Sequence, residues 1–271
     1  MDYKIIVDSC CDITPEMAAE LGITTVPLYL RLGNEEYMDD CSLDLPSFME
    51  KMRACTEKVG SAAPSPAAFT QAMTQDSFVV TISSALSATH QNATLGAQES
   101  SADVHIFNSK SASAGQTLIM LKLKELISDK LCKSQIVENV NEFIDGMKTY
   151  FVLERFDNLV KNGRLSAIKG KFASVLNIKL LLGANESGEI SLFAKARGKK
   201  QMLDKMLSFI SESGRKTTGE NAVITHVNNS SLADQLAGMI KDRFDFKKVF
   251  VVPTRGTSSL YADNKGIILA F

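Results

Sequence analysis

Four hydroxyl side chains that could bind an anion are gathered in the stretch FVVTISSALSATHQNA, residues 78–93. They are Ser83, Ser84, Ser87 and Thr89. An apolar run rich in β-formers precedes them and a segment with helical composition follows, which predicts a strand-to-helix turn. N–H groups in the first turn of a helix are unpaired, and together with hydroxyl donors they suit an anion. A helix cap at Ser83 or Ser84 would explain one hydroxyl but not four.

Ser87 and His90 could instead belong to a nucleophilic site, because positions i and i+3 share a helix face. The stretch has no G-x-S-x-G elbow, and no acid nearby would orient the imidazole. An anion cradle needs neither feature and is the interpretation that we favour. The enzymatic alternatives are a serine-dependent hydrolase and a phosphotransfer component acting on a small acidic substrate.

Two basic stretches lie in the second half of the chain, LVKNGRLSAIKGK at 159–171 and FAKARGKK at 193–200. Such charges commonly form a solvated face, and their concentration here alternatively predicts a docking surface for an acidic partner. Few aromatic residues interleave with them, which argues against RNA. The sequence has neither G-x-G-x-x-G nor G-x-x-x-x-G-K-[ST], so no nucleotide-binding loop is predicted.

The composition is that of an ordinary globular protein and excludes several classes. The chain has 271 residues, 45% of them hydrophobic, and a net charge of −1, which gives no reason to expect nucleic acid as a partner. The N-terminus runs straight into a strand, unlike a signal peptide, and no apolar run is long enough to span a membrane. Five cysteines without a CxxC pair and three scattered histidines predict reduced thiols, no zinc site and a cytoplasmic location.

Strands and helices alternate through the first half of the chain. Strands are predicted at 3–9, 23–32, 77–83 and 103–109, and helices at 12–21, 43–55, 66–74, 85–98 and 115–130. This alternation predicts right-handed βαβ units and a mostly parallel sheet, which binds ligands at the carboxyl ends of its strands. Small polar stretches fall at three of those ends: DSCCD, ISSALSAT and NSKSASAG.

After a predicted helix at 134–149 the pattern changes to α+β with a mixed sheet. Strands are predicted at 150–154, 222–227, 248–254 and 266–271, a hairpin at 178–196, and helices at 155–163, 199–212 and 232–244. We therefore predict two domains, an α/β domain over 1–147 and an α+β domain over 148–271.

Several motifs, in this order, resemble those of the DegV family of bacterial fatty-acid-binding proteins, which includes the carrier subunits of fatty-acid kinase. IIVDSCCDITPEMAAELGITTVPL is similar to the family's D-S-x-x-D-[IL] and V-[IV]-P-L, and ISSALSATHQNA to S-S-x-L-S-G-T-Y-x-[ST]-A. NSKSASAG resembles D-S-K-x-x-S-x-G, LVKNGRLS resembles L-x-K-G-G-R-[IL]-S, and LNIKLLL stands where the family has I-K-P. The resemblance covers essentially the whole chain.

The resemblance implies a carrier without catalysis or cofactor. A long-chain fatty acid would lie in an apolar tunnel, with its carboxylate at the domain junction, and the carrier would present it to a separate kinase. The carboxylate-binding residues implied in this sequence are Ser61, Ser87, Thr89 and Tyr261. The tunnel and a basic surface would belong to the second domain, with Arg164 and Arg197 as docking residues.

This sequence departs from the family pattern at several of these positions. Ser61-Ala62-Ala63 replaces T-S-Q before the proline, Ala88 replaces a glycine and His90 a tyrosine. The C-terminal H-x-G-[PQ]-G is absent, and Tyr261 aligns with its histidine. A phenol donates a hydrogen bond but carries no positive charge at neutral pH. We expect a divergent member that still binds a lipid acid; a scaffold protein with a vestigial pocket is the remaining alternative.

Overall fold

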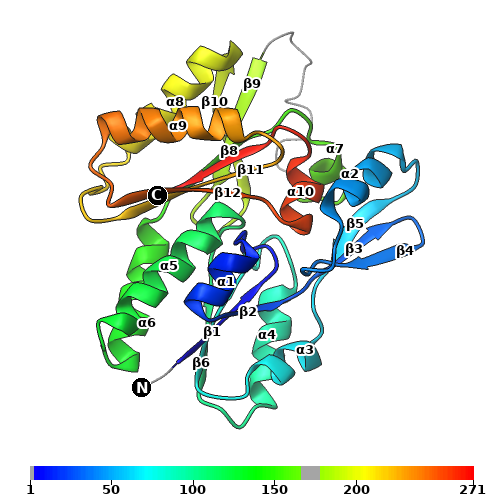
Figure 1. The fold of residues 1–271 in the computed structure, drawn as a ribbon, viewed down its shortest axis with the longest axis vertical. Coiled ribbons are helices and arrows are strands. Elements are labelled where there is room, and N and C mark those ends of the chain that lie inside the picture. Colours follow the sequence, from blue (N-terminus) through cyan, green and yellow to red (C-terminus); the bar gives the residue numbers. More distant parts are fainter. Residues whose placement is uncertain (1–2, 166–177) are drawn as a thin grey trace.

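The first half of the chain forms a four-stranded parallel sheet, in the lower part of Figure 1. The computed structural model describes residues 3–165 and 178–271. The sheet order is β2-β1-β6-β7, with β1 Lys4–Asp8, β2 Ile23–Val26, β6 Ser77–Thr81 and β7 Val104–Asn108. This confirms the predicted parallel sheet, and β1, β6 and β7 lie within a few residues of their predicted positions.

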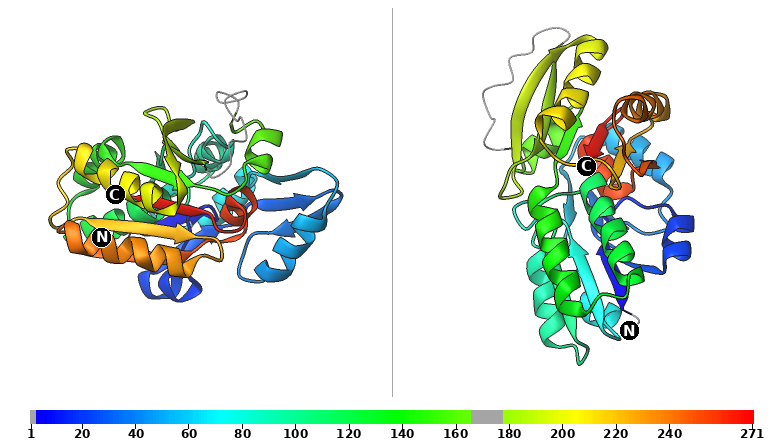
Figure 2. Two further views of the ribbon diagram at one scale, coloured as in Figure 1. Left: turned by 90° about the horizontal axis from the view of Figure 1, so that it is seen from above. Right: turned by 90° about the vertical axis from the view of Figure 1, so that its left-hand side faces the viewer.

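Helices cover both faces of this sheet, as Figure 2 shows, and the sequence of β1 explains why. Ile5 and Val7 face one core and Ile6 faces the other, so the strand is an unbroken apolar run rather than an alternating one. One face carries α3 and α4, and the other carries α5, against which α6 packs. The helices are α1 Pro15–Leu21, α3 Pro66–Ala72, α4 Thr89–Gln98, α5 Ala114–Ser128 and α6 Lys133–Gly146.

The strand predicted at 23–32 is wrong, because it is two strands in different sheets. Pro27 has no N–H to donate to a ladder, and it lies between β2 and β3, Tyr29–Leu32. A small antiparallel sheet of order β4-β3-β5 follows, with β4 Glu35–Met38 and β5 Val59–Ala62. Together with α2, Leu45–Ala54, it projects to the right in Figure 1. Ser61 therefore lies on a strand, β5.

The second half of the chain forms the predicted mixed sheet. Its order is β10-β9-β8-β13-β11-β12. Among the described strands of this sheet, β11 and β12 pair in parallel and all other neighbours are antiparallel. The strands are β8 Thr149–Val152, β9 Ile178–Ala184, β10 Ile190–Arg197, β11 Asn221–His226, β12 Lys248–Pro253 and β13 Ile267–Ala270. The predicted helix at 134–149 is too long, since α6 ends at Gly146 and Thr149 already belongs to β8.

The two sheets are joined through a continuous core. One face of the mixed sheet is covered by α8, Gly198–Glu212, and α9, Ser230–Arg243, while its other face packs against α5. Val223 and Ile268 from this sheet share one apolar cluster with Leu118 of α5 and Phe78 of β6. The domain boundary near residue 147 stays a prediction. No helix in residues 3–165 or 178–271 has the length and apolar character needed to cross a membrane.

Two short helices of the second half, α7 (Asp157–Lys161) and α10 (Gly256–Ala262), lie beside the small sheet. The sequence did not predict α10. Its start is held by the buried Asp39, whose Oδ1 accepts a hydrogen bond from Gly256 N at 2.9 Å. Asp39 Oδ2 accepts from Thr257 N at 2.8 Å and from Thr257 Oγ1 at 2.6 Å. One carboxylate thus satisfies three donors across more than two hundred residues of sequence.

We expect Asp39→Ala to lower the free energy of unfolding by about 2–4 kcal/mol, because it leaves buried donors without partners. Urea denaturation of the purified protein measures this. Asp40→Ala is the matched control and should change stability far less, because this neighbouring carboxylate accepts its hydrogen bonds from the N–H and hydroxyl of the exposed Ser42. Equal losses for the two variants would contradict a role for Asp39 in holding α10.

Candidate functional site

A cavity lies between the two sheets and the small antiparallel sheet. The cavity volume is about 120 Å³, which exceeds ordinary packing gaps. Its wall is mainly apolar and draws on both halves of the chain: Cys10, Leu28, Ile82, Leu86 and Ala112 from the first, and Phe151, Leu153, Leu159, Ala184, Ile190, Ala262 and Ile268 from the second.

Four polar side chains meet at one end of this cavity. Ser61 Oγ lies 3.0 Å from the Tyr261 hydroxyl, which joins β5 to α10. The Arg164 guanidinium lies 5.9 Å from the centre of the Tyr261 ring. Ser87 lines the same region, next to Leu86, whose carbonyl accepts a hydrogen bond from Arg164 Nε at 3.1 Å. Ser61, Ser87 and Tyr261, predicted from far-apart motifs, are therefore brought together.

Arg164 was predicted to dock a partner, and the structure places it in the cavity wall, half-buried. Its Nη1 donates to the Asn162 carbonyl at 2.7 Å and its Nε to the Leu86 carbonyl, so three of its five N–H donors have no partner among residues 3–165 and 178–271. Arginine stays protonated in proteins, so the cavity has a positive charge although residue 261 is a tyrosine. The docking role of Arg164 stays a prediction.

Thr89 is buried behind Ser87 and is not part of the cavity wall. Its Oγ1 lies 2.8 Å from Ser87 Oγ, and its N–H donates to the same oxygen. Thr89 begins α4, so the predicted helix start at residue 85 is wrong. Backbone N–H groups of Leu86 and Ser87 donate to the Ser83 carbonyl instead, forming a turn before the helix.

The four hydroxyls of the opening stretch do not form one cradle. Ser83 Oγ donates to the Gly188 carbonyl at 2.9 Å, and Ser84 Oγ accepts from Asn108 at 2.7 Å. Gly188, at the tip of the β9–β10 hairpin, has a φ of +80°, and a Cβ there would meet Ser83 Oγ at 2.3 Å. Two of the hydroxyls therefore hold loops in place, and only Ser87 reaches the cavity.

The Ser87 and His90 pair expected of a hydrolase is not formed. His90 Nδ1 lies 3.0 Å from Thr81 Oγ1, and Ser87 is paired with Thr89. Burial lowers the pKa of the imidazole, and no described carboxylate contacts it. The geometry thus gives no nucleophile–base–acid arrangement here.

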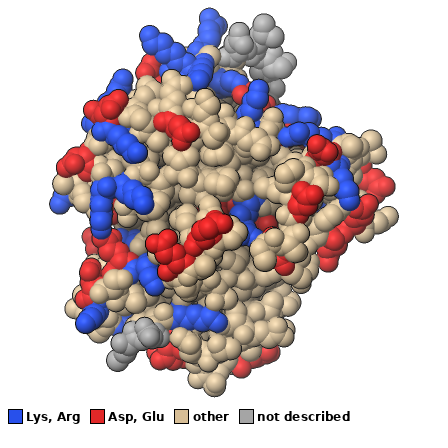
Figure 3. All heavy atoms as spheres, in the orientation of Figure 1, with Lys and Arg blue, Asp and Glu red and all other residues tan. Residues whose placement is uncertain are grey.

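Arg197, the second predicted docking residue, is exposed at the end of β10 and lies outside the cavity wall. Lys199 and Lys200, which follow it at the start of α8, are also exposed. Figure 3 shows Lys and Arg side chains gathered over the upper part of the molecule, where Figure 1 places α8. The predicted basic stretch at 159–171 lies outside the described residues from 166 onward.

The buried aspartates behind the cavity were not recognised as functional from the sequence. Asp8 accepts hydrogen bonds from the N–H groups of Cys10 and Ile82, at 2.9 and 2.6 Å. Asp12 accepts from Arg255 N and Ser113 Oγ. Because burial disfavours the charged form, the pKa of Asp8 rises to about 6 and that of Asp12 to about 7. Their spacing in DSCCD was visible, but their burial was not.

Comparison with known proteins assigns the family. Residues 2–269 match the family model described as "Uncharacterised protein, DegV family COG1307". The chain belongs to the DegV family. A DegV domain-containing protein of Streptococcus pneumoniae is 34% identical over 280 residues, which span 100% of this chain and 99% of that protein.

Two solved structures of this family share the fold along their whole length. A DegV family protein from Ruminococcus gnavus, refined with vaccenic acid, has a TM-score of 0.93 and 36% identity, over 99% of both chains. The Fatty Acid Kinase (Fak) B3 protein of Streptococcus pneumoniae, loaded with linoleic acid, has a TM-score of 0.92 and 33% identity, over 100% of this chain and 99% of that one. These confirm the predicted family and two-part fold.

The raised pKa of Asp12 predicts a pH-dependent stability. The pKa of Asp12 is higher in the folded chain than in the unfolded chain, so folding favours the protonated carboxyl. The stability that Asp12 contributes is therefore fully present below about pH 4 and is lost as the pH rises to about 7. Between about pH 5 and about pH 8, the unfolding free energy of the wild type should therefore fall relative to that of Asp12→Asn.

Urea denaturation at several pH values measures this difference. Asp145→Asn, at an exposed carboxylate, is the control for the general effect of replacing a carboxylate with an amide. A constant difference for Asp12→Asn would contradict the raised pKa.

Proposed function

We propose that the protein binds a long-chain fatty acid in this cavity, holding it as a cytoplasmic carrier without catalysing a reaction on it. The observation that carries the proposal is the apolar cavity with one cationic, hydroxyl-rich end at Ser61, Ser87, Arg164 and Tyr261. The fatty acids in the structures of the R. gnavus and S. pneumoniae relatives support the same ligand class here.

The carboxylate is proposed to accept hydrogen bonds at this end. Ser61 and Tyr261 share one hydrogen bond, as do Ser87 and Thr89, so each pair keeps one O–H hydrogen for a ligand. The uncommitted donors of Arg164 add a charge-assisted contact. A carboxylate has about four lone-pair sites, so this set is sufficient to pair a buried head group.

The other hydroxyls of the wall are already hydrogen-bonded within the protein. Ser113 and Thr257 donate to the carboxylates of Asp12 and Asp39, and Ser258 is also hydrogen-bonded to Asp12. Ser111 pairs with Thr149 and donates to the Ala112 carbonyl, so this pair, unlike the other two, keeps no O–H hydrogen for a ligand. They therefore do not compete for the head group, which favours a single orientation of the ligand. The remaining wall is apolar and suits the tail.

Tail burial provides most of the affinity. Each methylene contributes about 0.8 kcal/mol, so a tail of about sixteen carbons supplies on the order of 10 kcal/mol before the costs of ordering and association. The head-group contacts then set the orientation and add a smaller increment. Loss of one donor should consequently weaken binding without abolishing it.

Presentation of the acid to a separate kinase is the second part of the proposal. It is supported by the name of the S. pneumoniae relative, a Fatty Acid Kinase protein, and by the exposed cations near the start of α8. Arg197 is the residue that we assign to docking, since it lies outside the cavity wall. Arg164 lines the cavity wall, and its docking role stays a prediction.

We expect Tyr261→Phe to weaken binding of palmitic acid by about fivefold, the value of one neutral hydrogen bond, and Arg164→Gln by about tenfold or more. Equilibrium titration with delipidated protein measures both. Arg243→Gln, at an exposed arginine of α9, is the control. Unchanged affinity in both cavity variants would place the head group elsewhere.

Arg197→Glu should leave fatty-acid affinity unchanged and lower the rate of acyl phosphorylation by a partner kinase at limiting carrier concentration. Charge reversal at a docking surface acts mainly on encounter with the partner. Glu212→Lys, near the other end of α8, is the control for a general change in charge. A kinase rate that is insensitive to Arg197→Glu would remove this residue from the docking surface.

A further inference from the structure

Tyr261 lines two spaces, the apolar cavity and a separate polar cleft. Arg164 stands with Tyr261 on the cavity side, whereas the cleft walls come from α2, the loop after β8, α7 and the end of α10. The charged residues of the cleft are Arg53, Glu57, Arg155, Asp157, Lys161 and Asp263. The phenol thus stands between the proposed head-group end of the cavity and a charged cleft.

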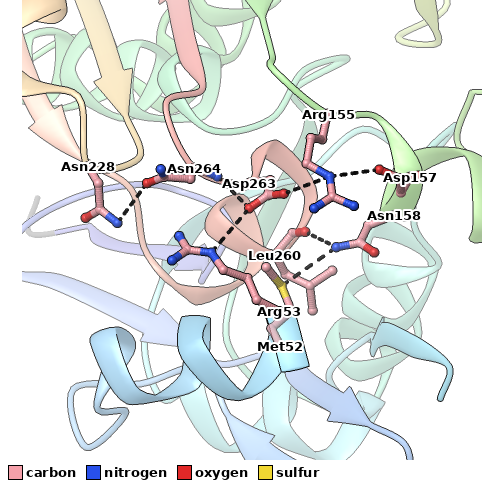
Figure 4. Close-up of polar contacts among 9 residues, drawn as sticks. All are labelled: Met52, Arg53, Arg155, Asp157, Asn158, Asn228, Leu260, Asp263 and Asn264. Carbon is pink, nitrogen blue, oxygen red and sulfur yellow. Dashed lines mark hydrogen bonds and ion pairs between the residues drawn. The ribbon is translucent and has the colours of Figure 1, made fainter. Parts of the chain in front are cut away.

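Two arginines in this cleft face one carboxylate from opposite sides, as Figure 4 shows. Asp263 Oδ1 lies 4.0 Å from Arg53 Nε, and its Oδ2 lies 3.7 Å from Arg155 Nε. Both separations exceed hydrogen-bonding distance, so Asp263 is attracted to the arginines without being hydrogen-bonded to them. The carboxylate is only 14% exposed, whereas the two arginine side chains are 42% and 65% exposed.

The donors of this cleft are largely uncommitted. Arg155 Nε also donates to Asp157 at 3.1 Å, but among the described residues no hydrogen bond joins the Nη atoms of either arginine to another group. Lys161, exposed at the end of α7, has no ion pair with any described residue. The planar guanidinium fork can donate two parallel hydrogen bonds to two oxygens of a phosphate, so two neighbouring arginines suit a phosphate group.

Asp263 follows α10 directly, as its C-cap residue. Its φ is +52° with ψ −176°, a conformation that costs a residue with a Cβ free energy. The chain therefore keeps a carboxylate in an unfavourable backbone conformation between two arginines. It occupies the space in which an external anion would bind the same two cations.

We propose that this cleft binds the phosphate of a phosphorylated fatty acid, which replaces the Asp263 carboxylate between Arg53 and Arg155. The inference rests on the proposed binding of an acyl chain in the cavity, since the chain would bring the phosphate to the Tyr261 side. The six charged side chains of the cleft balance formally, so a phosphate dianion binds favourably only when Asp263 turns away.

Titration with two amphiphiles of equal chain length tests this. Palmitic acid reports on the cavity, and hexadecyl phosphate, which resists hydrolysis, reports on the cavity and the cleft together. Arg53→Gln and Arg155→Gln should each weaken hexadecyl phosphate binding by about tenfold, as expected for loss of a charge-assisted contact, and leave palmitic acid within about twofold. Asp263→Asn should strengthen hexadecyl phosphate binding by about fivefold, because the competing anion is gone.

Arg31→Gln, at an exposed arginine of β3 outside the cleft, is the matched control and should change neither affinity. Equal effects of Arg53→Gln or Arg155→Gln on both ligands, or no gain with Asp263→Asn, would overturn the cleft assignment while leaving the carrier function intact. Inorganic phosphate that binds as tightly as hexadecyl phosphate would show a free-phosphate site instead. If palmitic acid itself fails to bind, the proposed carrier function fails rather than this inference alone.

Discussion

The hydrogen bonds from the backbone at the start of α10 to Asp39 and Asp12 are the constraint on which the cavity depends. Asp39 lies between β4 and α2, Asp12 follows β1, and α10 comes from the last part of the chain. These contacts fix Thr257 and Tyr261 against Ser61 of the small sheet. Burying carboxylates is costly, and hydrogen bonds from backbone N–H and hydroxyl donors at each one offset that cost. Without this attachment, α10 would not be held in place as the wall of the cavity that carries Tyr261.

The same arrangement separates charge within the molecule. The buried carboxylates of Asp8 and Asp12 point at backbone and side-chain donors behind the cavity, and their raised pKa values show how strongly burial opposes their ionisation. Arg164 provides the cation of the cavity wall, beside Ser87 and Tyr261. The proposed anionic head group would therefore find its counter-charge at Arg164, the one charged residue of the described wall. A histidine at position 261 is not needed for that purpose.

The sequence predicted the two sheets because their strands are apolar runs with clear helical segments between them. It failed where long-range contacts decide the structure. α10 has only seven residues, GTSSLYA, with no helical apolar pattern, and it is held by Asp39 from more than two hundred residues away. Pro27 marked the break between β2 and β3, and this signal was available but not used.

The candidate site was predicted in part. Ser61, Ser87 and Tyr261 were assigned through motif resemblance, and the structure brings them together. Arg164 looked like one charge in a basic surface stretch, because spacing cannot show a guanidinium folding back onto the Leu86 and Asn162 carbonyls. The predicted four-hydroxyl anion cradle does not form, since Ser83 and Ser84 bond to distant partners that only the tertiary structure supplies.

Mass spectrometry of the purified protein tests the central claim most directly, first under native conditions and then after denaturing extraction. The proposed function predicts one long-chain fatty acid per chain, retained in the native ion and released only on denaturation. Delipidated protein should bind added palmitic acid with the same stoichiometry. A ligand-free protein that also fails to bind added fatty acids would contradict the account, and the cavity would then need a different occupant.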